Sequence, residues 1–254
     1  MERSILYLTT VFGFKRNGIE QTSGLLQREL PIFYHMNVKL DGQSIPAQRV
    51  FCIGMNYTEH VQELNSKTPD QPVVFMKPAQ SIAPTGKELI FPEHGNDLHY
   101  ETELVILIGR SGHVKNEIEA LSFIQGLTIG FDLTMRDLQG KLKKAGHPWE
   151  LSKSFENSAP LGNFIHFNSS IDIHNIRFEG SINNEIRQKG NSAEMIFPIE
   201  KLIHYIGSVW KFIPGDIIFT GTPPGVGSLS KTDVISAHSQ TLSLDFTWKF
   251  YSGK

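Results

Sequence analysis

The stretch HYETELVILIG, residues 99–109, decides how the rest of the chain is interpreted. It begins with polar residues and continues as an apolar run rich in β-branched side chains, which predicts a buried strand ended by Gly109. Because side chains alternate along a strand, His99, Glu101 and Glu103 are expected on one face. Two carboxylates at the mouth of a buried strand repel each other, so a cation, a proton or a basic partner must compensate them. A hard divalent metal ion fits this requirement best.

The bulk properties of the chain indicate a globular protein of one large domain or two small ones. It has 254 residues, 39% of them hydrophobic and 20% charged, which excludes a disordered chain. A net charge of −2 without a basic tail gives a nucleic-acid partner no electrostatic support. No apolar run approaches the roughly 20 residues of a membrane span, and the single cysteine, Cys52, allows no intrachain disulfide. We therefore expect a cytoplasmic protein with neither a nucleic-acid nor a membrane partner.

The first 35 residues follow a different pattern from the rest of the chain. Residues 5–14 are mildly apolar, but without a clear cleavage site they make a poor signal peptide. Scattered glutamates interrupt the basic character that a transit peptide would need. We expect residues 1–35 to be an extension that the core does not need, and residues 36–254 to form a single catalytic domain.

Strands outnumber helices in the pattern along the chain, and the helices are scattered between them. The expected strands cover residues 50–54, 73–78, 88–91, 99–109, 127–132, 171–181, 185–189, 217–220, 234–237 and 241–250. The expected helices begin near Tyr57, at Asn116, after a cap at Thr134, and at Pro198. This pattern predicts an α+β, β-rich domain rather than a doubly wound sheet.

Asp132 supplies a third carboxylate. It ends the predicted strand at residues 127–132 and so lies at a strand mouth, as Glu101 and Glu103 do. Three carboxylates from two neighbouring strands can hold Mg²⁺ or Mn²⁺ on one side and leave about three positions for water and a chelating α-keto acid. The alternative is that the two glutamates are surface carboxylates on an edge strand.

His60 and Glu63 are three residues apart on a predicted helix, so their side chains can meet. A carboxylate beside an imidazole orients the ring and raises its basicity, which makes a general base for activating water. Taken alone, the spacing favours a simple ion pair on an exposed helix.

Several cations and one loop are candidates for binding an anionic substrate. Lys77 and Lys153 lie among apolar or small residues, and Arg136 lies one turn past Asp132. These cations could pair with substrate carboxylates, although a lysine on a solvated edge is the commoner case. The loop TGTPPGVG, residues 220–227, has glycines for close backbone approach and hydroxyls that could bind a carboxylate.

Six segments, taken in order, resemble the fumarylacetoacetate hydrolase family. They are GMNYTEHVQE at 54–63, FMKP at 75–78, HYETEL at 99–104, DLTMRDLQ at 132–139, PWELSKSF at 148–155 and TGTPPGVG at 220–227. The resemblance extends from about residue 50 to the end of the chain. Through KKAGHPWE at 143–150 it is closest to the small single-domain members of the acylpyruvase and fumarylpyruvate hydrolase type.

The resemblance implies a core of mixed strands arranged as a β-roll, a homodimer, and a site for Mg²⁺ or Mn²⁺. The metal ligands that it implies are Glu101, Glu103 and Asp132. The catalytic residues that it implies are His60 and Glu63, as a water-activating base on a lid-like helix, and Lys153, which polarises the substrate oxygen or stabilises an enolate. The substrate contacts that it implies are Tyr57, Lys77, Arg136, Gln139 and Thr222. With three carboxylates already available, we expect His99 beside the site rather than as a ligand.

The predicted activity is hydrolysis of the C3–C4 bond of a 2,4-dioxo acid, an acylpyruvate such as fumarylpyruvate, to pyruvate and a carboxylic acid. The same site could serve an isomerase of the 2-hydroxyhepta-2,4-diene-1,7-dioate type, or an oxaloacetate decarboxylase or tautomerase. The His60–Glu63 pair favours hydrolysis. An inactive metal-binding scaffold is a further alternative, and the complete set of acids argues against it.

Overall fold

In the computed structural model, which describes residues 36–63 and 66–251, the apolar run forms the centre of the largest sheet. It becomes β7 (Thr102–Ile108), all of whose residues are buried. β7 lies between β8 (Ile124–Phe131) and β14 (Ile217–Phe219) and is antiparallel to both. A strand covered on both faces needs apolar side chains on both, which explains why the run does not alternate.

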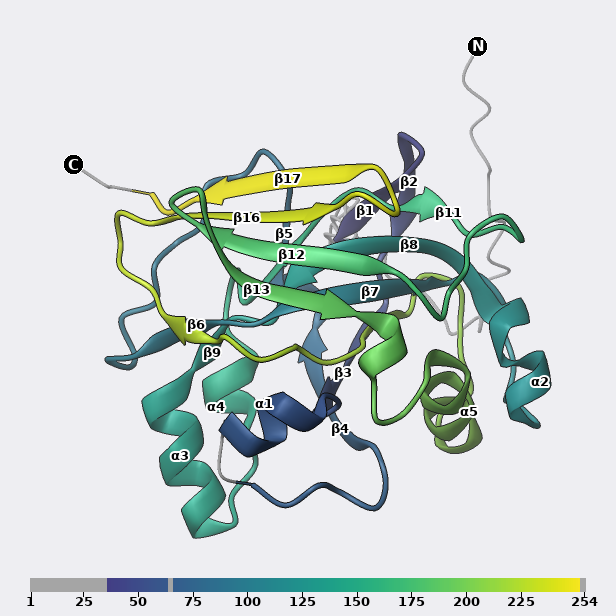
Figure 1. Cartoon of the computed structure of the whole chain (residues 1–254), viewed down its shortest axis with the longest axis horizontal. Helices are drawn as coiled ribbons and strands as arrows, with labels where there is room; N and C mark the ends of the chain where they lie inside the picture. Colours follow the sequence, from purple (N-terminus) through teal and green to yellow (C-terminus); the bar gives the residue numbers. More distant parts are fainter. Residues whose placement is uncertain (1–35, 64–65, 252–254) are drawn as a thin grey trace, which may run out of the picture. The chain divides into compact units, whose positions relative to one another are not determined.

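The largest sheet has eight strands and mixed directions, as Figure 1 shows. Its order is β4-β3-β14-β7-β8-β10-β5, with β11 beside β8. The strands not yet given are β3 (Arg49–Gly54), β4 (Val73–Pro78), β5 (Ile82–Pro84), β10 (Ala159–Leu161) and β11 (Ile165–His166). β14 runs parallel to β3, and β10 runs parallel to β5. The expected β-rich α+β fold with a core of mixed strands is confirmed.

A second sheet of four antiparallel strands closes the main hydrophobic core. Its order is β13 (Glu185–Asn191), β12 (Arg177–Ile182), β16 (Val234–Ser239) and β17 (Leu244–Lys249). β12 contacts β7, and β16 contacts β8 (Figure 1). Phe131 of the large sheet meets Trp248 of the small one edge to face, with ring centroids 5.8 Å apart. The core therefore lies between the two sheets.

Two smaller sheets and short helices complete the fold. β6 (Leu98–Tyr100) lies between β15 (Gly227–Ser228) and β9 (Thr134–Met135), and β1 (Asn37–Leu40) pairs with β2 (Gln43–Pro46). The α-helices are α1 (Thr58–Glu63), α2 (Glu117–Ala120), α3 (Arg136–Ala145), α4 (Glu150–Lys153) and α5 (Ile199–Val209). Single 3-10 turns occupy Ala79–Ser81, Leu121–Phe123 and Ser192–Glu194. Figure 1 shows α1, α3 and α4 near one another and α5 beside α2.

Local sequence signals explain several element ends. Asn116 caps α2 by accepting a hydrogen bond from the Glu119 amide, as its position predicted. Gly146, with φ of 66°, ends α3 in the left-handed region where glycine is favoured. Asn183 and Asn184 also have positive φ and form the predicted hairpin turn between β12 and β13.

The structure corrects the expected strand at residues 99–109. It is two strands, β6 and β7, interrupted at Glu101. The break arises because the chain changes sheets there: β6 pairs with β9 and β15, whereas β7 pairs with β8 and β14. The Glu101 carbonyl, at the break, instead accepts a hydrogen bond of 2.8 Å from the Asp132 amide.

Three further expectations about local structure were wrong. Residues 88–91 form no strand, because only Leu89 makes an isolated bridge, to Phe250. Thr134 does not cap α3; it lies in β9 and its hydroxyl donates to the Asp132 carbonyl, so Met135 takes the cap position. The strand expected from residue 171 begins only at Arg177.

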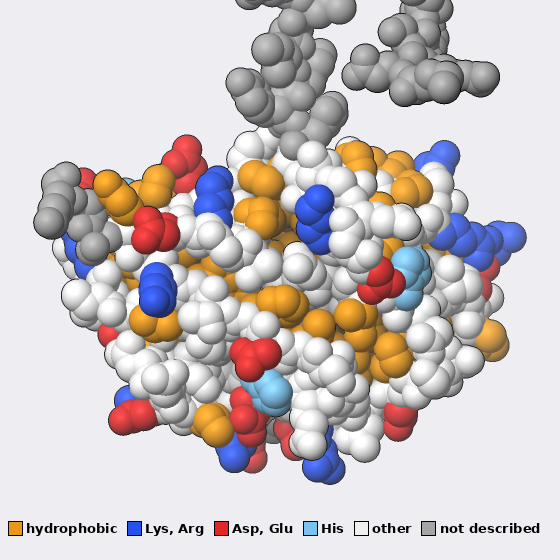
Figure 2. All heavy atoms as spheres, turned by 90° about the horizontal axis from the view of Figure 1, so that it is seen from above, with side chains coloured by type: hydrophobic (Ala, Val, Ile, Leu, Met, Phe, Trp, Pro, Cys, Tyr) orange, Lys and Arg blue, Asp and Glu red, His pale blue; other side chains and the backbone are white. Residues whose placement is uncertain are grey.

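The described part of the chain exposes several hydrophobic side chains. Figure 2 shows one face on which hydrophobic side chains are interspersed with polar and charged ones. Among the described residues the large exposed hydrophobic side chains are Ile90, Ile118, Leu151, Ile186, Val209, Ile213 and Tyr251. The homodimer stays a prediction. Within the same residues, no helix has the length and apolar character needed to cross a membrane.

Candidate active site

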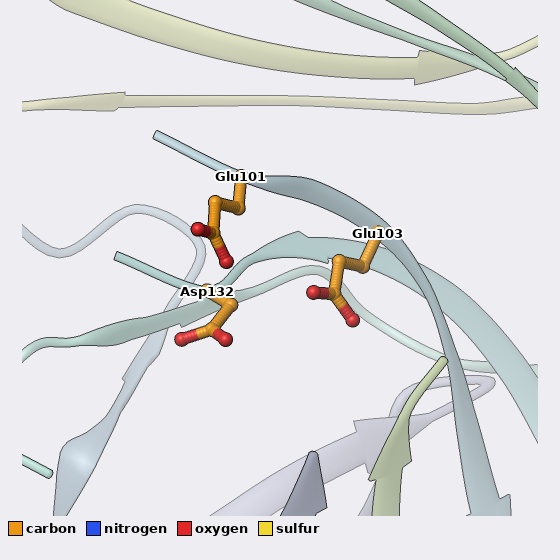
Figure 3. Close-up of side chains that lie close together, drawn as sticks. All are labelled: Glu101, Glu103 and Asp132. Carbon is orange, nitrogen blue, oxygen red and sulfur yellow. The ribbon is translucent and has the colours of Figure 1, made fainter. Parts of the chain in front are cut away.

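Three carboxylates converge where β7 begins and β8 ends. Glu101 lies in the break before β7, Glu103 lies in β7, and Asp132 follows β8. The antiparallel register pairs Glu103 with Gly130, which brings the start of β7 beside the end of β8. One ligand atom from each of the three carboxylates lies within 4.8 Å of the other two, and Figure 3 shows them pointing toward a common centre. All three side chains are buried.

The charges around this triad are unevenly compensated. Burial, together with the charges of Asp132 and Glu101, raises the pKa of Glu103 well above its usual value, although Glu103 accepts a 2.7 Å hydrogen bond from the Gly221 amide. Burial would also raise the pKa of Glu101, but the charges of Lys153 and Arg136 lower it below its usual value. The site therefore lacks positive charge on the Glu103 side. Three buried carboxylates with this deficit fit a hard divalent cation such as Mg²⁺ or Mn²⁺.

Cationic side chains surround the triad. The Lys153 ammonium donates to Glu101 Oε2 and to Asp132 Oδ2, each at 2.7 Å. Burial lowers the pKa of Lys153, but the charges of Asp132 and Glu101 raise it by more than burial lowers it. The pKa of Lys153 is therefore above its usual value, and the ammonium keeps its proton. Arg136 donates to Glu101 Oε1, and to Gln139 Oε1 at 2.5 Å. Lys77 Nζ lies 2.8 Å from Asp132 Oδ1.

The structure brings His60 and Glu63 together on α1. His60 Nδ1 lies 3.1 Å from Glu63 Oε2, and the His60 side chain is buried. Glu63 also accepts a hydrogen bond of 3.1 Å from the amide of Gly225. That glycine has φ of 96°, and a Cβ there would lie 2.2 Å from the Arg187 carbonyl, so the loop conformation requires glycine.

One cavity lies between His60 of the dyad and two of the three acids. Among its lining residues are His60, Glu101, Glu103 and Lys153, and three of the expected substrate contacts, Arg136, Gln139 and Thr222. The cavity also includes residues that were not singled out as site residues, and they are Ile53, Gly54, Met55, Phe75, Lys143 and Trp149. Phe75 and Trp149 lie inside the quoted segments FMKP and PWELSKSF, so segment membership was the signal that could have identified them.

Five residues singled out from the sequence lie outside the lining of this cavity: Glu63, Asp132, Tyr57, Lys77 and His99. Glu63 reaches it through His60, and Asp132 lies beside Glu101 and Glu103. Tyr57 is buried and lies against a separate hollow that includes Glu194. Lys77 is buried among backbone carbonyls. His99 Nε2 lies 3.0 Å from Asp97 Oδ2 and 3.2 Å from the hydroxyl of Ser228.

Comparisons with known proteins match most of this chain. Residues 49–247 match the family model described as Fumarylacetoacetate (FAA) hydrolase C-terminal. The chain is 40% identical over 194 residues to oxaloacetate tautomerase YcgM of Escherichia coli (strain K12), covering 75% of this chain and 88% of that protein. It is 38% identical over 190 residues to the mitochondrial oxaloacetate tautomerase FAHD1 of Bos taurus, covering 75% and 86%.

This chain is also similar to a solved structure. The fumarylpyruvate hydrolase from Pseudomonas aeruginosa, determined in complex with Mn²⁺ and pyruvate, superposes with a TM-score of 0.80 and 30% sequence identity. The match covers 85% of this chain and 95% of that one. This chain therefore belongs to the fumarylacetoacetate hydrolase C-terminal family.

Proposed function

We propose that this chain is a divalent-metal-dependent enzyme that interconverts the keto and enol forms of oxaloacetate, a 2-oxo dicarboxylic acid. The observation that carries the proposal is one cavity lined by His60, Glu101, Glu103 and Lys153. Asp132 completes the group of acids beside the two glutamates, and Glu63 contacts the His60 ring. Relatives 38–40% identical over three quarters of this chain are named oxaloacetate tautomerases, which supports this substrate.

The acids define what a metal would contribute. Glu101, Glu103 and Asp132 would hold the ion. Mg²⁺ or Mn²⁺ would supply positive charge beside the substrate's 2-oxo oxygen and so stabilise the negative charge that develops there. The Mn²⁺ and pyruvate named for the Pseudomonas aeruginosa structure support both the ion and a 2-oxo acid ligand.

The dyad supplies the proton transfer. With Nδ1–H donating to Glu63, the His60 ring presents unprotonated Nε2 as a base. In the keto-to-enol direction this nitrogen removes a proton from C3 of the substrate, and the 2-oxo oxygen gains one. Lys153 lies in the cavity with its proton retained and can donate a hydrogen bond to that oxygen.

The cavity also offers charge for the second carboxylate of the substrate. Arg136 and Lys143, both from α3, line it together with Gln139. Guanidinium and ammonium groups are the usual partners of carboxylates in proteins. A substrate with a carboxylate at each end suits a cavity that has Lys153 beside the acids and two further cations on α3.

Hydrolysis of acylpyruvates is the second candidate. The similarity to the fumarylpyruvate hydrolase favours it, as does the buried His60, which could deprotonate water instead of C3. Water would then add to C4 of a 2,4-dioxo acid, the C3–C4 bond would break, and the products would be pyruvate and a carboxylic acid. The two candidates differ in which atom gives its proton to His60.

A substrate panel separates the two functions. Enol-oxaloacetate, acetylpyruvate and fumarylpyruvate are each given to the protein with Mg²⁺, and loss of enol absorbance, pyruvate release and CO₂ release are followed. We expect the protein to accelerate loss of the enol form of oxaloacetate above the spontaneous rate without releasing pyruvate. Chelation of the metal should abolish this acceleration. Rapid pyruvate release from an acylpyruvate, with uncatalysed enol loss, would instead establish the hydrolase. Pyruvate and CO₂ released together from oxaloacetate would identify a decarboxylase.

A further inference from the structure

Lys77 is a buried charge that the proposed reaction does not use. It lies in β4 and is 1% exposed. A lysine is almost never buried to this degree unless its charge is paired, because removing an ammonium from water costs several kcal/mol. Its contacts therefore indicate what it does.

Every N–H group of the Lys77 ammonium is used by the protein. Nζ donates to the carbonyl of Leu133 at 3.2 Å, to that of Ser158 at 3.0 Å, and to that of Lys153. An ammonium has three N–H groups, so three carbonyls occupy all of them. No donor is left for a substrate, and Lys77 does not line the cavity.

The same ammonium faces the triad. Asp132 Oδ1 lies 2.8 Å from Lys77 Nζ, while Asp132 Oδ2 accepts a 2.7 Å hydrogen bond from Lys153. The Asp132 carboxylate is thus held between two lysine charges. In a buried site such a pairing is screened little by solvent.

The three carbonyls belong to the backbone around the site. Leu133 is the residue after Asp132, and Lys153 provides the ammonium that reaches Glu101 and Asp132. Ser158 joins the two segments, because its carbonyl accepts from the Leu133 amide and its hydroxyl donates to the Lys153 carbonyl. Lys77 therefore lies where the backbone of an acid of the triad and the backbone of the cavity lysine come together.

We propose that Lys77 is a positioning residue that orients the Asp132 carboxylate for a divalent ion and holds the backbone of Lys153, without contacting substrate. The inference rests on the metal site of the proposed function and is independent of which 2-oxo acid reacts. It replaces the substrate contact that the family resemblance implied for this lysine.

The test is a calorimetric titration of Mn²⁺ into the metal-free chain of 254 residues, comparing wild type with Lys77→Met and Lys189→Met. Lys189 is the matched control, because it also lies on a strand but its side chain is 72% exposed. We expect Lys189→Met to bind Mn²⁺ as wild type does and Lys77→Met to bind it about tenfold or more weakly, the usual effect of removing a group that supports a ligand. At saturating Mn²⁺, kcat of Lys77→Met should also fall.

The alternative outcomes are distinct. Unchanged Mn²⁺ affinity in a folded Lys77→Met protein, with a raised KM for oxaloacetate, would overturn the inference and restore a substrate contact. Unchanged affinity with unchanged kinetics would overturn it as well. Failure of the wild-type chain itself to bind Mn²⁺ would instead refute the metal site, and with it the proposed function.

A second variant tests the proposal if Lys77→Met does not fold. Lys77→Met leaves buried carbonyls with one donor fewer, so it could fail to show cooperative thermal unfolding. Lys77→Arg keeps a positive charge and hydrogen-bond donors, but a planar guanidinium cannot occupy the place of a compact ammonium. We expect it to fold and to bind Mn²⁺ more weakly than wild type. Affinity equal to that of wild type would overturn the proposal.

Discussion

Two acids of the triad and His60 of α1 line one cavity, but the triad and α1 are held in different ways. Glu101, Glu103 and Asp132 are buried at the paired ends of two long strands and are contacted by lysine, arginine and backbone donors. α1 has only six residues, and the side chain of its Glu63 is 33% exposed. One contact between α1 and the rest of the chain is the hydrogen bond that the Gly225 amide donates to the Glu63 carboxylate.

This difference indicates separate roles for the triad, which would bind the ion, and the dyad, which would transfer a proton. Groups fixed on strands and paired in the interior are preorganised for binding an ion, because their geometry costs nothing to assemble when the ligand arrives. A short helix held by few contacts is less able to supply fixed ligands but can carry an acid–base group. We therefore expect substitutions in the triad to remove metal binding and activity together, and substitutions in the dyad to remove activity alone.

The largest effect is expected for Asp132→Asn. Loss of one acid would remove the ion and with it several kcal/mol of charge stabilisation. At 1.36 kcal/mol per factor of ten, kcat/KM for enol-oxaloacetate should fall about a thousandfold or more. Asp245→Asn, in β17 with a side chain 75% exposed, is the control and should keep full activity. A loss for Asp132→Asn no larger than that of the control would show that the triad has no part in the reaction.

His60→Ala should lower kcat about a hundredfold or more, the usual contribution of a general base. His238→Ala is the matched control, since His238 also faces a carboxylate, Asp245 at 3.9 Å, but on the exposed face of β16. Steady-state kinetics at saturating Mg²⁺ measure both variants. Wild-type turnover in His60→Ala would exclude His60 as the base.

Glu63→Gln should have a smaller effect than loss of His60. The amide keeps the size of the side chain but removes the charge that orients the imidazole and accepts the Gly225 amide. We expect kcat to fall about ten- to a hundredfold, by analogy with carboxylates that orient metal-bound imidazoles. Glu59→Gln, on the same helix, should leave kcat unchanged. If both variants lose activity equally, the effect comes from the helix and not from the dyad.

The smallest effect is expected for Ser228→Ala. The Ser228 hydroxyl donates to Asp97 Oδ1 at 2.5 Å and lies beside His99. None of these three residues lines the cavity. We expect near-wild-type kcat and a loss of unfolding free energy of about 1 kcal/mol or less, the usual value of one hydrogen bond. Kinetics and denaturant unfolding measure the two quantities. A large loss of kcat with unchanged stability would give the His99 cluster a direct role.

The identity of the triad could be predicted from the sequence, but its geometry could not. The spacing of Glu101 and Glu103 suggested one strand face, whereas Glu101 lies in the break between two strands. The apolar run does not reveal that break, because the strands that pair on either side of it, such as β9 and β14, come from distant parts of the chain.

Long-range contacts also decide what the cations and the dyad do. The apolar surroundings of Lys77 in FMKP singled it out, but its role depends on carbonyls 56 to 81 residues further along the chain. The hydrogen bond from Gly225 to Glu63 spans 162 residues. Local patterns predict which residues are candidates, and only tertiary packing determines which groups each one contacts.

A calorimetric titration of Mn²⁺ into the metal-free chain tests the division between triad and dyad most directly. We predict that wild type and His60→Ala bind one ion per chain with equal affinity, and that Asp132→Asn binds none. Loss of Mn²⁺ binding in a folded His60→Ala protein, or binding by Asp132→Asn at wild-type affinity, would contradict the account.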